Sequence, residues 1–280
     1  MRNQVHPWQL VLCDLDGTML NQFNEISPEN LAAVAALSEY RIGFSLATGR
    51  MDAMTRLFVR QLRVTLPIIA CNGAVIRDCT TNELLAQTCI PADDVIALTD
   101  WLKRKGLDFL VYTPDSVYYP PESRRIDVMH QYNRQARAVG QPLVPLHELD
   151  ARTQSQVAPG AVKILAMIPD FSAMTDLQAQ LAIHPGSAAV MSMDYAIDIM
   201  AAGVTKGDAM LQLARMIGVQ PSQIVTLGDH DNDASMLRMS GLGIAMGNAT
   251  PLAVAASRIQ TLSHEQSGVA DAIRRYILPN

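Results

Sequence analysis

Five short apolar segments recur along the chain, each about as long as one β-strand. They cover residues 10–13, 42–47, 67–71, 223–228 and 241–247. Within each segment the apolar residues are continuous and do not alternate with polar ones. This pattern indicates strands that are buried on both faces, as in a parallel sheet.

Helical patterns lie between these segments. Residues 27–40 begin with Ser27, a typical N-cap, followed by Pro28 at the first helical position. Residues 206–219 carry apolar side chains at helical spacing, and the pattern ends at Gly218. Strands that alternate with helices in this way predict an α/β fold with a Rossmann-like, doubly wound parallel sheet.

The middle of the chain has a different pattern, with shorter apolar runs and more loop. Residues 161–169 and 188–200 resemble strands, and residues 171–183 resemble a helix. We therefore expect a small α+β domain inserted into the larger sheet domain. The predicted boundaries are 1–87 and 190–280 for the Rossmann-like core and 88–189 for the inserted domain.

The composition narrows the range of partners. Of the 280 residues 49% are hydrophobic and 18% charged, and the formal net charge is −5, which is typical of a globular protein and argues against nucleic acid as a partner. No signal peptide or membrane span is recognisable, so we expect a cytoplasmic protein with no membrane partner. The four cysteines form no C-x-x-C pair, and we expect them to be reduced, with Cys13 and Cys71 in the core. No pattern indicates an oligomeric state.

Polar residues, together with one glycine, follow four of the predicted strands, at the point where each strand ends. They are Asp14 and Asp16 after the first, Thr48, Gly49 and Arg50 after the second, Asn72 after the third, and Asp229, Asn232 and Asp233 after the fourth. In an open parallel sheet, ligands bind beyond the carboxyl ends of the strands, so these residues are expected to share one site. The alternative, that polar residues merely end strands, explains each case singly but not the set.

The acidic residues of this set indicate a bound cation. Asp14 and Asp16 point the same way if the segment is extended. Neighbouring carboxylates cannot all ionise without a counter-charge, and Asp229 and Asp233 add to this cost. Oxygen ligands without histidine or cysteine favour a hard ion, and Mg²⁺ is the usual choice when the substrate carries a phosphate. Residues 228–233 could instead suggest a calcium loop, but they lack the spacing and the distal glutamate of an EF-hand.

Lys206 and Thr48 are candidates for binding an anion. Lys206 opens a predicted helix, so its ammonium group and the positive helix end could meet a phosphate together. Thr48 offers a hydroxyl group, and with Gly49 it offers backbone N–H groups to phosphate oxygens. Each has a plain alternative: a lysine at a helix start is often only solvated, and Thr48 could cap a helix that begins near Arg50.

Four segments form an ordered set of motifs: "DLDGT" (14–18), "SLATGR" (45–50), "GVTKGDAM" (203–210) and "LGDHDND" (227–233). In order and spacing they resemble the four motifs of the haloacid-dehalogenase-like hydrolases. "NGA" (72–74), "AMGNA" (245–249) and the insert between the second and third motifs resemble one branch, the Cof-type phosphatases. The resemblance covers nearly the whole chain. It implies a Rossmann-like core with a mobile α+β cap, here the insert, that selects the substrate.

The resemblance also implies a role for each residue of the site. Asp14 would attack phosphorus and become an aspartyl-phosphate, and Asp16 would protonate the leaving alcohol and later activate water. Thr48 and Lys206 would hold the phosphoryl oxygens and neutralise their charge. The side chains of Asp14 and Asp229 and the backbone carbonyl of Asp16 would bind Mg²⁺.

Further residues would bind the substrate or support this group. Contacts to the phosphate or the substrate would come from Gly49, Arg50, Asn72 and Asn232. Asp233 would support Lys206 or the water molecules around the metal. The chain departs from the family pattern at Gln266 and Ser267, where many relatives carry an acidic or asparagine-containing run. His230 stands in a variable position and is expected to be peripheral.

The function implied by the resemblance is a Mg²⁺-dependent phosphatase, a phosphoric monoester hydrolase. Its substrate would be a small phosphorylated metabolite, such as a sugar phosphate or a phosphorylated cofactor. One alternative is a phosphomutase of the same superfamily, which would return the phosphoryl group from Asp14 to a sugar hydroxyl. Another is a non-catalytic phosphate-binding or phospho-acceptor regulator. Receiver domains also combine aspartates, a threonine and a lysine, but they are much shorter and lack a partner like Asp16.

Overall fold

The computed structural model describes residues 6–193 and 195–279, and the chain divides into two compact units. The first comprises Met1–Gly49, Leu57–Leu85 and Thr205–Asn280, and the second comprises Arg50–Arg56 and Ala86–Val204. Each unit has its own sheet and its own buried hydrophobic core.

A five-stranded parallel sheet forms the centre of the first unit, with the strand order β14-β13-β12-β1-β2. Its strands are β1 (Leu10–Cys13), β2 (Gly43–Leu46), β12 (Ile224–Gly228), β13 (Leu242–Ala245) and β14 (Ile259–Gln260). All residues of β1 and β12 are buried, which confirms the interpretation of the continuous apolar segments. The chain leaves β1 toward β2 on one side and later adds β12 on the other, so β1 lies at the switch point, where such sheets bind ligands.

The third predicted strand, expected within residues 67–71, forms as a strand but belongs to a separate small sheet. The strands β3 (Ile68–Ala70), β4 (Val75–Arg77) and β5 (Leu84–Gln87) form a separate three-stranded sheet. β3 meets the central sheet through a single parallel bridge between Ala47 and Ile69, and it pairs antiparallel with β4. The cause is the tight turn directly after β3, where Cys71 and Asn72 have left-handed φ angles of 47° and 54°.

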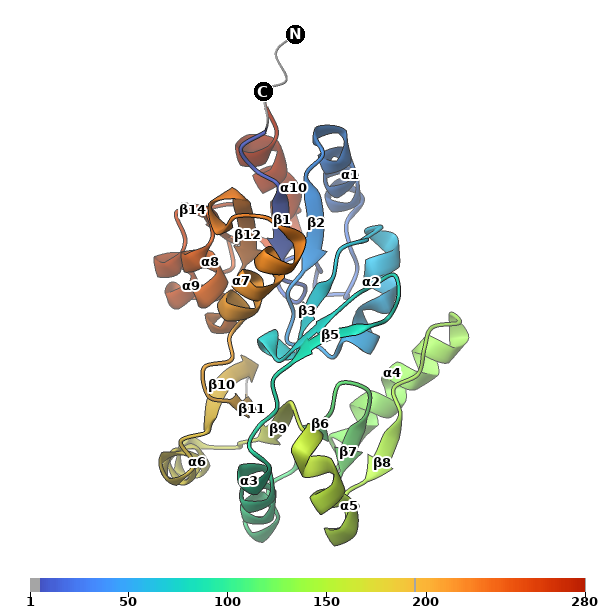
Figure 1. The fold of residues 1–280 in the computed structure, drawn as a ribbon, viewed down its shortest axis with the longest axis vertical. Helices are drawn as coiled ribbons and strands as arrows, with labels where there is room; N and C mark the ends of the chain where they lie inside the picture. Colours follow the sequence, from blue (N-terminus) through green and yellow to red (C-terminus); the bar gives the residue numbers. More distant parts are fainter. Residues whose placement is uncertain (1–5, 194, 280) are drawn as a thin grey trace. The chain divides into compact units, whose positions relative to one another are not determined.

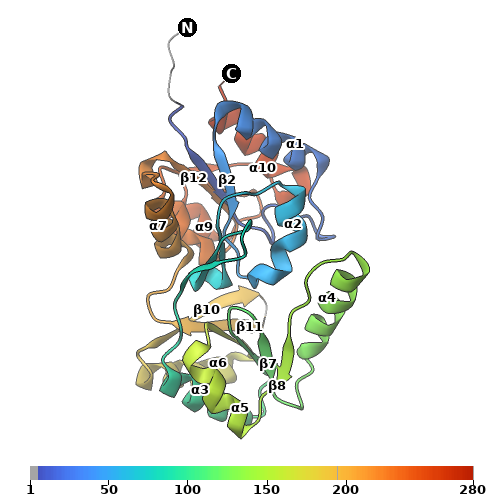
Figure 2. The same cartoon turned by 45° about the vertical axis from the view of Figure 1, so that its right-hand side comes forward.

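Helices cover both faces of the central sheet. They are α1 (Pro28–Leu37), α2 (Arg56–Gln61), α7 (Lys206–Ile217), α8 (Ala234–Met239), α9 (Pro251–Ala256) and α10 (Gly268–Ala272). α1 and α10 pack together on one face, and α7, α8 and α9 lie on the other (Figures 1 and 2). As predicted, Ser27 caps α1 by accepting a hydrogen bond from the backbone N–H of Asn30 at 3.2 Å, and α7 ends at Gly218.

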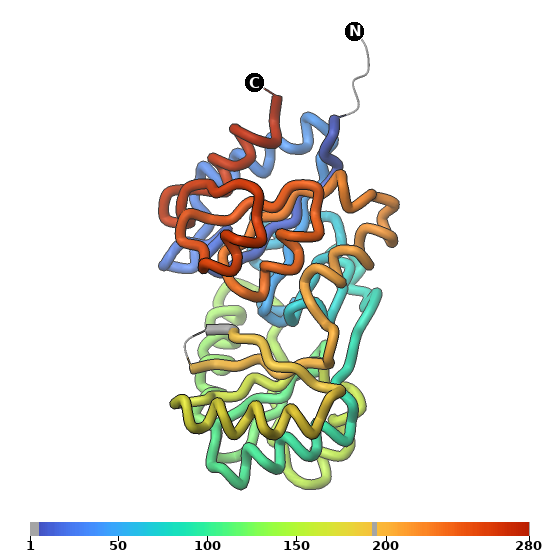
Figure 3. The backbone as a smooth tube through the Cα atoms, turned by 90° about the vertical axis from the view of Figure 1, so that its left-hand side faces the viewer, coloured from blue at the N-terminus to red at the C-terminus, as the bar shows by residue number. Residues whose placement is uncertain are grey.

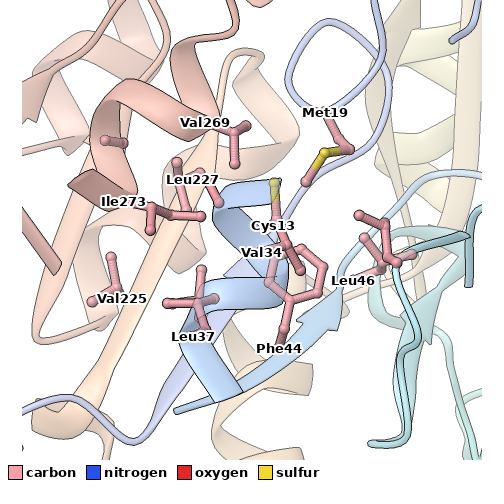
Figure 4. Packing of buried hydrophobic residues seen from close by; sticks show 14 of the residues in the cluster. Cys13, Met19, Val34, Leu37, Phe44, Leu46, Val225, Leu227, Val269 and Ile273 are labelled. Carbon is pink, nitrogen blue, oxygen red and sulfur yellow. The ribbon is translucent and has the colours of Figure 1, made fainter. Parts of the chain in front are cut away.

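The core of the first unit lies where α1 and α10 meet the sheet. Figure 4 shows Val34 and Leu37 of α1 among the strand residues Phe44 and Leu227 and the α10 residue Val269. Leu227 and Val269 have no exposed surface, and full burial of such a side chain contributes about 1.5–3 kcal/mol. This packing fixes the strand ends from which the polar residues project.

The second unit contains a mixed six-stranded sheet with the order β10-β11-β9-β6-β7-β8. Its strands are β6 (Phe109–Tyr112), β7 (Val117–Tyr119), β8 (Leu146–Glu148), β9 (Lys163–Met167), β10 (Ser187–Met193) and β11 (Ala196–Ala201), and its helices are α3 (Ala92–Arg104), α4 (Ile126–Ala138), α5 (Ala151–Val157) and α6 (Phe171–Ile183). α3 and α6 lie on the same face of this sheet (Figure 3), where they share one core with α5. No helix in the described part of the chain has the length and apolar character needed to cross a membrane.

The second unit extends further toward the C-terminus than the predicted boundary after residue 189. The segment expected to be extended over 188–200 is two strands, β10 and β11, which pair antiparallel. β11 also pairs antiparallel with β9, so its backbone hydrogen bonds belong to the sheet of the second unit. The unit therefore ends at Val204. Residues 190–204, predicted to lie in the core domain, belong to the inserted one.

A buried ion pair lies on the sheet of the second unit. Lys163 of β9 and Asp198 of β11 are 5% and 0% exposed, and Lys163 Nζ lies 3.3 Å from Asp198 Oδ1. The same ammonium group lies 4.6 Å from the centre of the Tyr112 ring. The neighbouring residues Ile164 and Ile199 belong to the core on the helix-covered face, so this pair lies on the opposite face of the sheet.

Candidate active site

Three aspartates meet at the carboxyl ends of β1 and β12. The two strands pair Cys13 with Leu227, so Asp14 and Asp229 leave the sheet at neighbouring points. Both are buried, with 5% and 9% of their surface exposed. Together with Asp233 they form a group in which one carboxylate oxygen of each lies within 4.8 Å of the others.

Asp233 is held by the loop that follows β12. Its Oδ2 accepts hydrogen bonds from the backbone N–H groups of Asp229 at 2.9 Å and His230 at 3.0 Å. This close wrapping requires Gly228, because a Cβ atom there would lie 2.6 Å from the Cβ of Asp233. The sequence "GD" at the end of β12 therefore serves the position of Asp233 as well as that of Asp229.

Lys206 supplies the opposite charge. It is the first residue of α7, whose N-cap is Thr205, and it is only 1% exposed. Its Nζ donates to Asp14 Oδ1 at 2.6 Å and to Asp233 Oδ1 at 2.6 Å. The alternative that this lysine is merely solvated is therefore wrong.

Within this group of described side chains, three carboxylates face one ammonium group. Burial raises the pKa of Asp14 well above its usual range, and the carboxylates of Asp233 and Asp229 raise it further, while Lys206 opposes them. Burial, followed by Asp233, raises the pKa of Asp229 to about 7. Burial would lower the pKa of Lys206, but the two carboxylates outweigh it and raise that pKa.

These residues fit a hard divalent cation. Three buried carboxylates face one ammonium group. Burial is the main cause of the raised pKa values of Asp14 and Asp229, and the neighbouring carboxylates add to it. Carboxylate oxygens are the preferred ligands of such ions. A cation bound between Asp14 and Asp229 would provide the charge that Lys206 alone does not.

Thr48 and Gly49 follow β2 and lie against the turn after β3. Thr48 is fully buried; its N–H donates to the carbonyl of Ile69 at 2.9 Å, and its carbonyl accepts from the N–H of Asn72 at 3.0 Å. The next helical turn has Met51 as its N-cap, so the alternative of Thr48 as a cap is wrong. A Cβ atom on Gly49 would lie 2.9 Å from Asn72 Oδ1, which explains the glycine.

Asn72 and Asn232 connect the turn after β3 to the loop after β12. Asn232 Nδ2 donates to Asn72 Oδ1 at 2.9 Å. The turn also approaches the start of α7 so closely that a Cβ atom on Gly73 would lie 2.4 Å from the carbonyl oxygen of Thr205. The first unit thus brings Asn72, Asn232 and Lys206 into one neighbourhood, although they come from three separate motifs.

Two predicted residues stand apart from this buried group. The side chain of Asp16 is exposed, although its charge contributes to the raised pKa values of Asp14 and Asp229. Arg50 belongs to the second unit, so its predicted place at the rim of the site stays a prediction.

Two residues to which the sequence analysis gave no role contact Asp229. Thr18 Oγ1 donates to Asp229 Oδ1 at 2.8 Å. Asn248 Nδ2 donates to Asp229 Oδ2 at 3.2 Å and to the carbonyl of Gly17 at 2.9 Å. Both residues lie inside recognisable motifs, "DLDGT" and "AMGNA", which is the signal that could have marked them.

The fold is that of a known class of enzymes. The chain matches the family of haloacid dehalogenase-like hydrolases over residues 11–273 and belongs to this family. The resemblance stated for the four motifs, including its Cof-type branch, is therefore confirmed, and so is the α/β fold with a Rossmann-like parallel sheet.

Individual relatives are similar to this chain over nearly its full length. The putative phosphatase YxeH of Bacillus subtilis (strain 168) is 26% identical over 276 residues, which cover 97% of this chain and 99% of that protein. The 5-amino-6-(5-phospho-D-ribitylamino)uracil phosphatase YwtE of the same organism is 28% identical over 278 residues, 93% of this chain and 95% of that protein. A crystal structure of a haloacid dehalogenase-like hydrolase from Bacteroides thetaiotaomicron has a TM-score of 0.79 at 25% identity and covers 96% of this chain and 99% of that one. The predicted enzyme class, a phosphoric monoester hydrolase, is confirmed.

Proposed function

We propose that this protein is a Mg²⁺-dependent phosphatase that hydrolyses small phosphomonoesters through an aspartyl-phosphate on Asp14. The observation that supports this best is the position of Lys206 Nζ, 2.6 Å from both Asp14 and Asp233 within a group of buried carboxylates. The ammonium group favours the ionised, nucleophilic form of Asp14 against the burial that raises its pKa.

In the first step, a carboxylate oxygen of Asp14 attacks phosphorus, and the bond between phosphorus and the ester oxygen breaks. The carboxyl group of Asp16 donates its proton to the leaving alkoxide, which departs as an alcohol. Asp16 suits this role because its side chain is exposed, whereas that of Asp14 is buried. Lys206, Thr48 and the N–H of Gly49 hold the phosphoryl oxygens as charge develops.

In the second step, water attacks the phosphorus of the aspartyl-phosphate, and the bond from phosphorus to Asp14 breaks. The water proton passes to the carboxylate of Asp16, which restores the enzyme and releases inorganic phosphate. When bound, Mg²⁺ would be held by Asp14, Asp229 and the carbonyl of Asp16, and it would supply positive charge against the phosphoryl oxygens. Asp233 keeps Lys206 in place between the two steps.

The substrate is a small phosphorylated metabolite, such as a sugar phosphate or a phosphorylated cofactor. The relative YwtE, which is named as a 5-amino-6-(5-phospho-D-ribitylamino)uracil phosphatase, supports this class. In this proposal Asn72, Asn232 and Arg50 contact the phosphate or the adjoining part of the substrate. The inserted unit acts as the cap that selects the rest of the molecule.

The test compares the wild type with Asp14→Asn and Asp16→Asn on p-nitrophenyl phosphate and on a panel of phosphorylated metabolites, with and without Mg²⁺. Asp14→Asn should abolish turnover. Asp16→Asn should lower kcat by about 10²–10⁴-fold for poor leaving groups and much less for p-nitrophenolate, which needs no proton. Asp231→Asn is the matched control, because this exposed aspartate lies in the same loop as Asp233 and accepts a hydrogen bond from the Thr250 hydroxyl.

Three results would contradict parts of the proposal. If Asp14→Asn hydrolysed p-nitrophenyl phosphate as fast as the wild type, the nucleophile would be wrong. If both variants lost only Mg²⁺ affinity, and to the same extent, the division of roles between Asp14 and Asp16 would be wrong. A requirement for a sugar bisphosphate would indicate a phosphomutase, and a long-lived phospho-Asp14 without turnover would indicate a phospho-acceptor.

A further inference from the structure

Asn248 joins the two loops that carry the proposed metal ligands. It follows β13, and its exposed side chain reaches back over the ends of β1 and β12. One amide nitrogen, Nδ2, donates both to the carbonyl of Gly17 at 2.9 Å and to Asp229 Oδ2 at 3.2 Å. A single side chain thus contacts the loop of Asp14 and the carboxylate of Asp229 together.

The carboxylate of Asp229 lies in a close-fitting cradle. A Cβ atom on Gly17 would lie 2.4 Å from Asp229 Oδ2, so only glycine allows this approach. Thr18 donates to Oδ1 at 2.8 Å, and Asn248 donates to Oδ2. Each oxygen therefore receives one hydrogen bond, which fixes the plane of the carboxylate.

This fixation opposes a specific force. Asp229 lies among the carboxylates of Asp14 and Asp233, and their mutual repulsion favours rotation of Asp229 away from the group. Lys206 bonds Asp14 and Asp233, whereas the hydrogen bonds described for the Asp229 carboxylate come from neutral donors, Thr18 and Asn248. Hydrogen-bond partners of metal-ligating side chains commonly change metal affinity about 10–100-fold.

Asn248 is itself anchored. Its Oδ1 accepts a hydrogen bond from the backbone N–H of His264 at 3.0 Å, which decides which end of the amide faces Asp229. The same segment holds the loop after β1, because the side chain of Glu265 accepts from the N–H of Gln22 at 2.7 Å. His264 and Glu265, directly before the two positions that depart from the family pattern, therefore support Asn248 and the loop after β1.

We propose that Asn248 is a positioning residue that holds the Asp229 carboxylate ready for Mg²⁺, an inference that rests on the proposed function. It touches no reacting atom and acts through Asp229. Its loss should weaken Mg²⁺ binding while leaving turnover at saturating Mg²⁺ nearly intact, since Asp14, Asp16 and Lys206 stay in place.

The experiment measures the dissociation constant of Mg²⁺ by calorimetry, without substrate, for the wild type, Asn248→Ala and Thr250→Ala. Thr250 is the matched control: it lies two residues away and caps α9, so its loss destabilises the same loop, but its side chain bonds Asp231 and not Asp229. Asn248→Ala should raise the Mg²⁺ dissociation constant about 10–100-fold, and Thr250→Ala should leave it unchanged. The Mg²⁺ dependence of p-nitrophenyl phosphate hydrolysis should shift by the same factor, with KM for the ester unaltered.

Because Asn248 is exposed, the alanine variant leaves no buried cavity, and its melting temperature without Mg²⁺ checks that it is folded. The inference is overturned if Asn248→Ala binds Mg²⁺ as tightly as the wild type. It is also overturned if Thr250→Ala weakens binding equally, since the effect would then be loss of loop stability. A wild-type protein that neither binds Mg²⁺ nor hydrolyses phosphate esters would instead refute the proposed function, and the inference with it.

Discussion

Replacing Asp233 with alanine tests whether a buried network holds the site together. The side chain is fully buried and accepts hydrogen bonds from Lys206 Nζ at 2.6 Å, Asp229 N at 2.9 Å and His230 N at 3.0 Å. A hydrogen bond to a charged group contributes about 1.5–3 kcal/mol, but these three share one carboxylate and do not simply add. Lys206 keeps its 2.6 Å contact with Asp14 in the variant, so the cost comes from the lost hydrogen bonds and from the two backbone N–H groups left without this acceptor. We expect Asp233→Ala to lower the free energy of unfolding of the first unit by about 1–3 kcal/mol.

Urea unfolding followed by tryptophan fluorescence measures this loss. Trp8 packs against the core of the first unit and Trp101 lies in the core of the second, so a Trp101→Phe background lets the signal report on the first unit alone. Asp231→Ala is the control, because this exposed residue accepts one hydrogen bond from Thr250; it should change the free energy by no more than about 0.5 kcal/mol. Equal losses for the two variants would refute the reasoning, since burial and the contact to Lys206 would then contribute nothing.

Two further predictions concern stability. Lys163→Met should destabilise the second unit by about 3–5 kcal/mol, because it leaves Asp198 buried without the ammonium group that lies 3.3 Å away. Lys105→Met is the control and should cost less than about 1 kcal/mol, since its pair with Asp176 is nearly half exposed. Urea unfolding of both variants measures the two losses, and equal losses would contradict the prediction. Ser27→Ala should cost about 1–2 kcal/mol in thermal or urea unfolding, because Ser27 caps α1 and also accepts a hydrogen bond from Ser267 Oγ at 2.9 Å. A neutral Ser27→Ala would show that the cap is not used.

The elements that the sequence predicted correctly are those with strong local signals. β1, β2, β12 and β13 lie within the apolar segments, since a strand buried on both faces consists mostly of apolar residues. α1 and α7 begin and end as their caps predicted. Local signals did not predict the structure where the pairing partner of a strand decides its place in a sheet. β3 pairs mainly with β4, and residues 188–200 form two strands because β11 pairs with β9.

The prediction of the site was limited in the same way, because it could not include contacts that depend on strand pairing. Strand ends and motif spacing placed Asp14, Asp229 and Asp233 together, and the structure agrees. The sequence did not reveal that Asn248 would reach Asp229 across 19 positions, or that Thr18 would do so across 211. Such contacts depend on the order of strands in the sheet, which no local pattern contains.

By itself, the sequence determined the fold class, the family and the residue types that a phosphoryl-transfer site needs, because burial, capping and motif spacing are local properties of the chain. Only the tertiary structure decided where the inserted unit ends, which charge faces which, and which neutral donors hold Asp229. The physical reason is that these depend on pairing between distant segments. Lys206 meets Asp14 across 192 positions of the chain, and only the packing of α7 and β1 within one unit fixes their 2.6 Å contact.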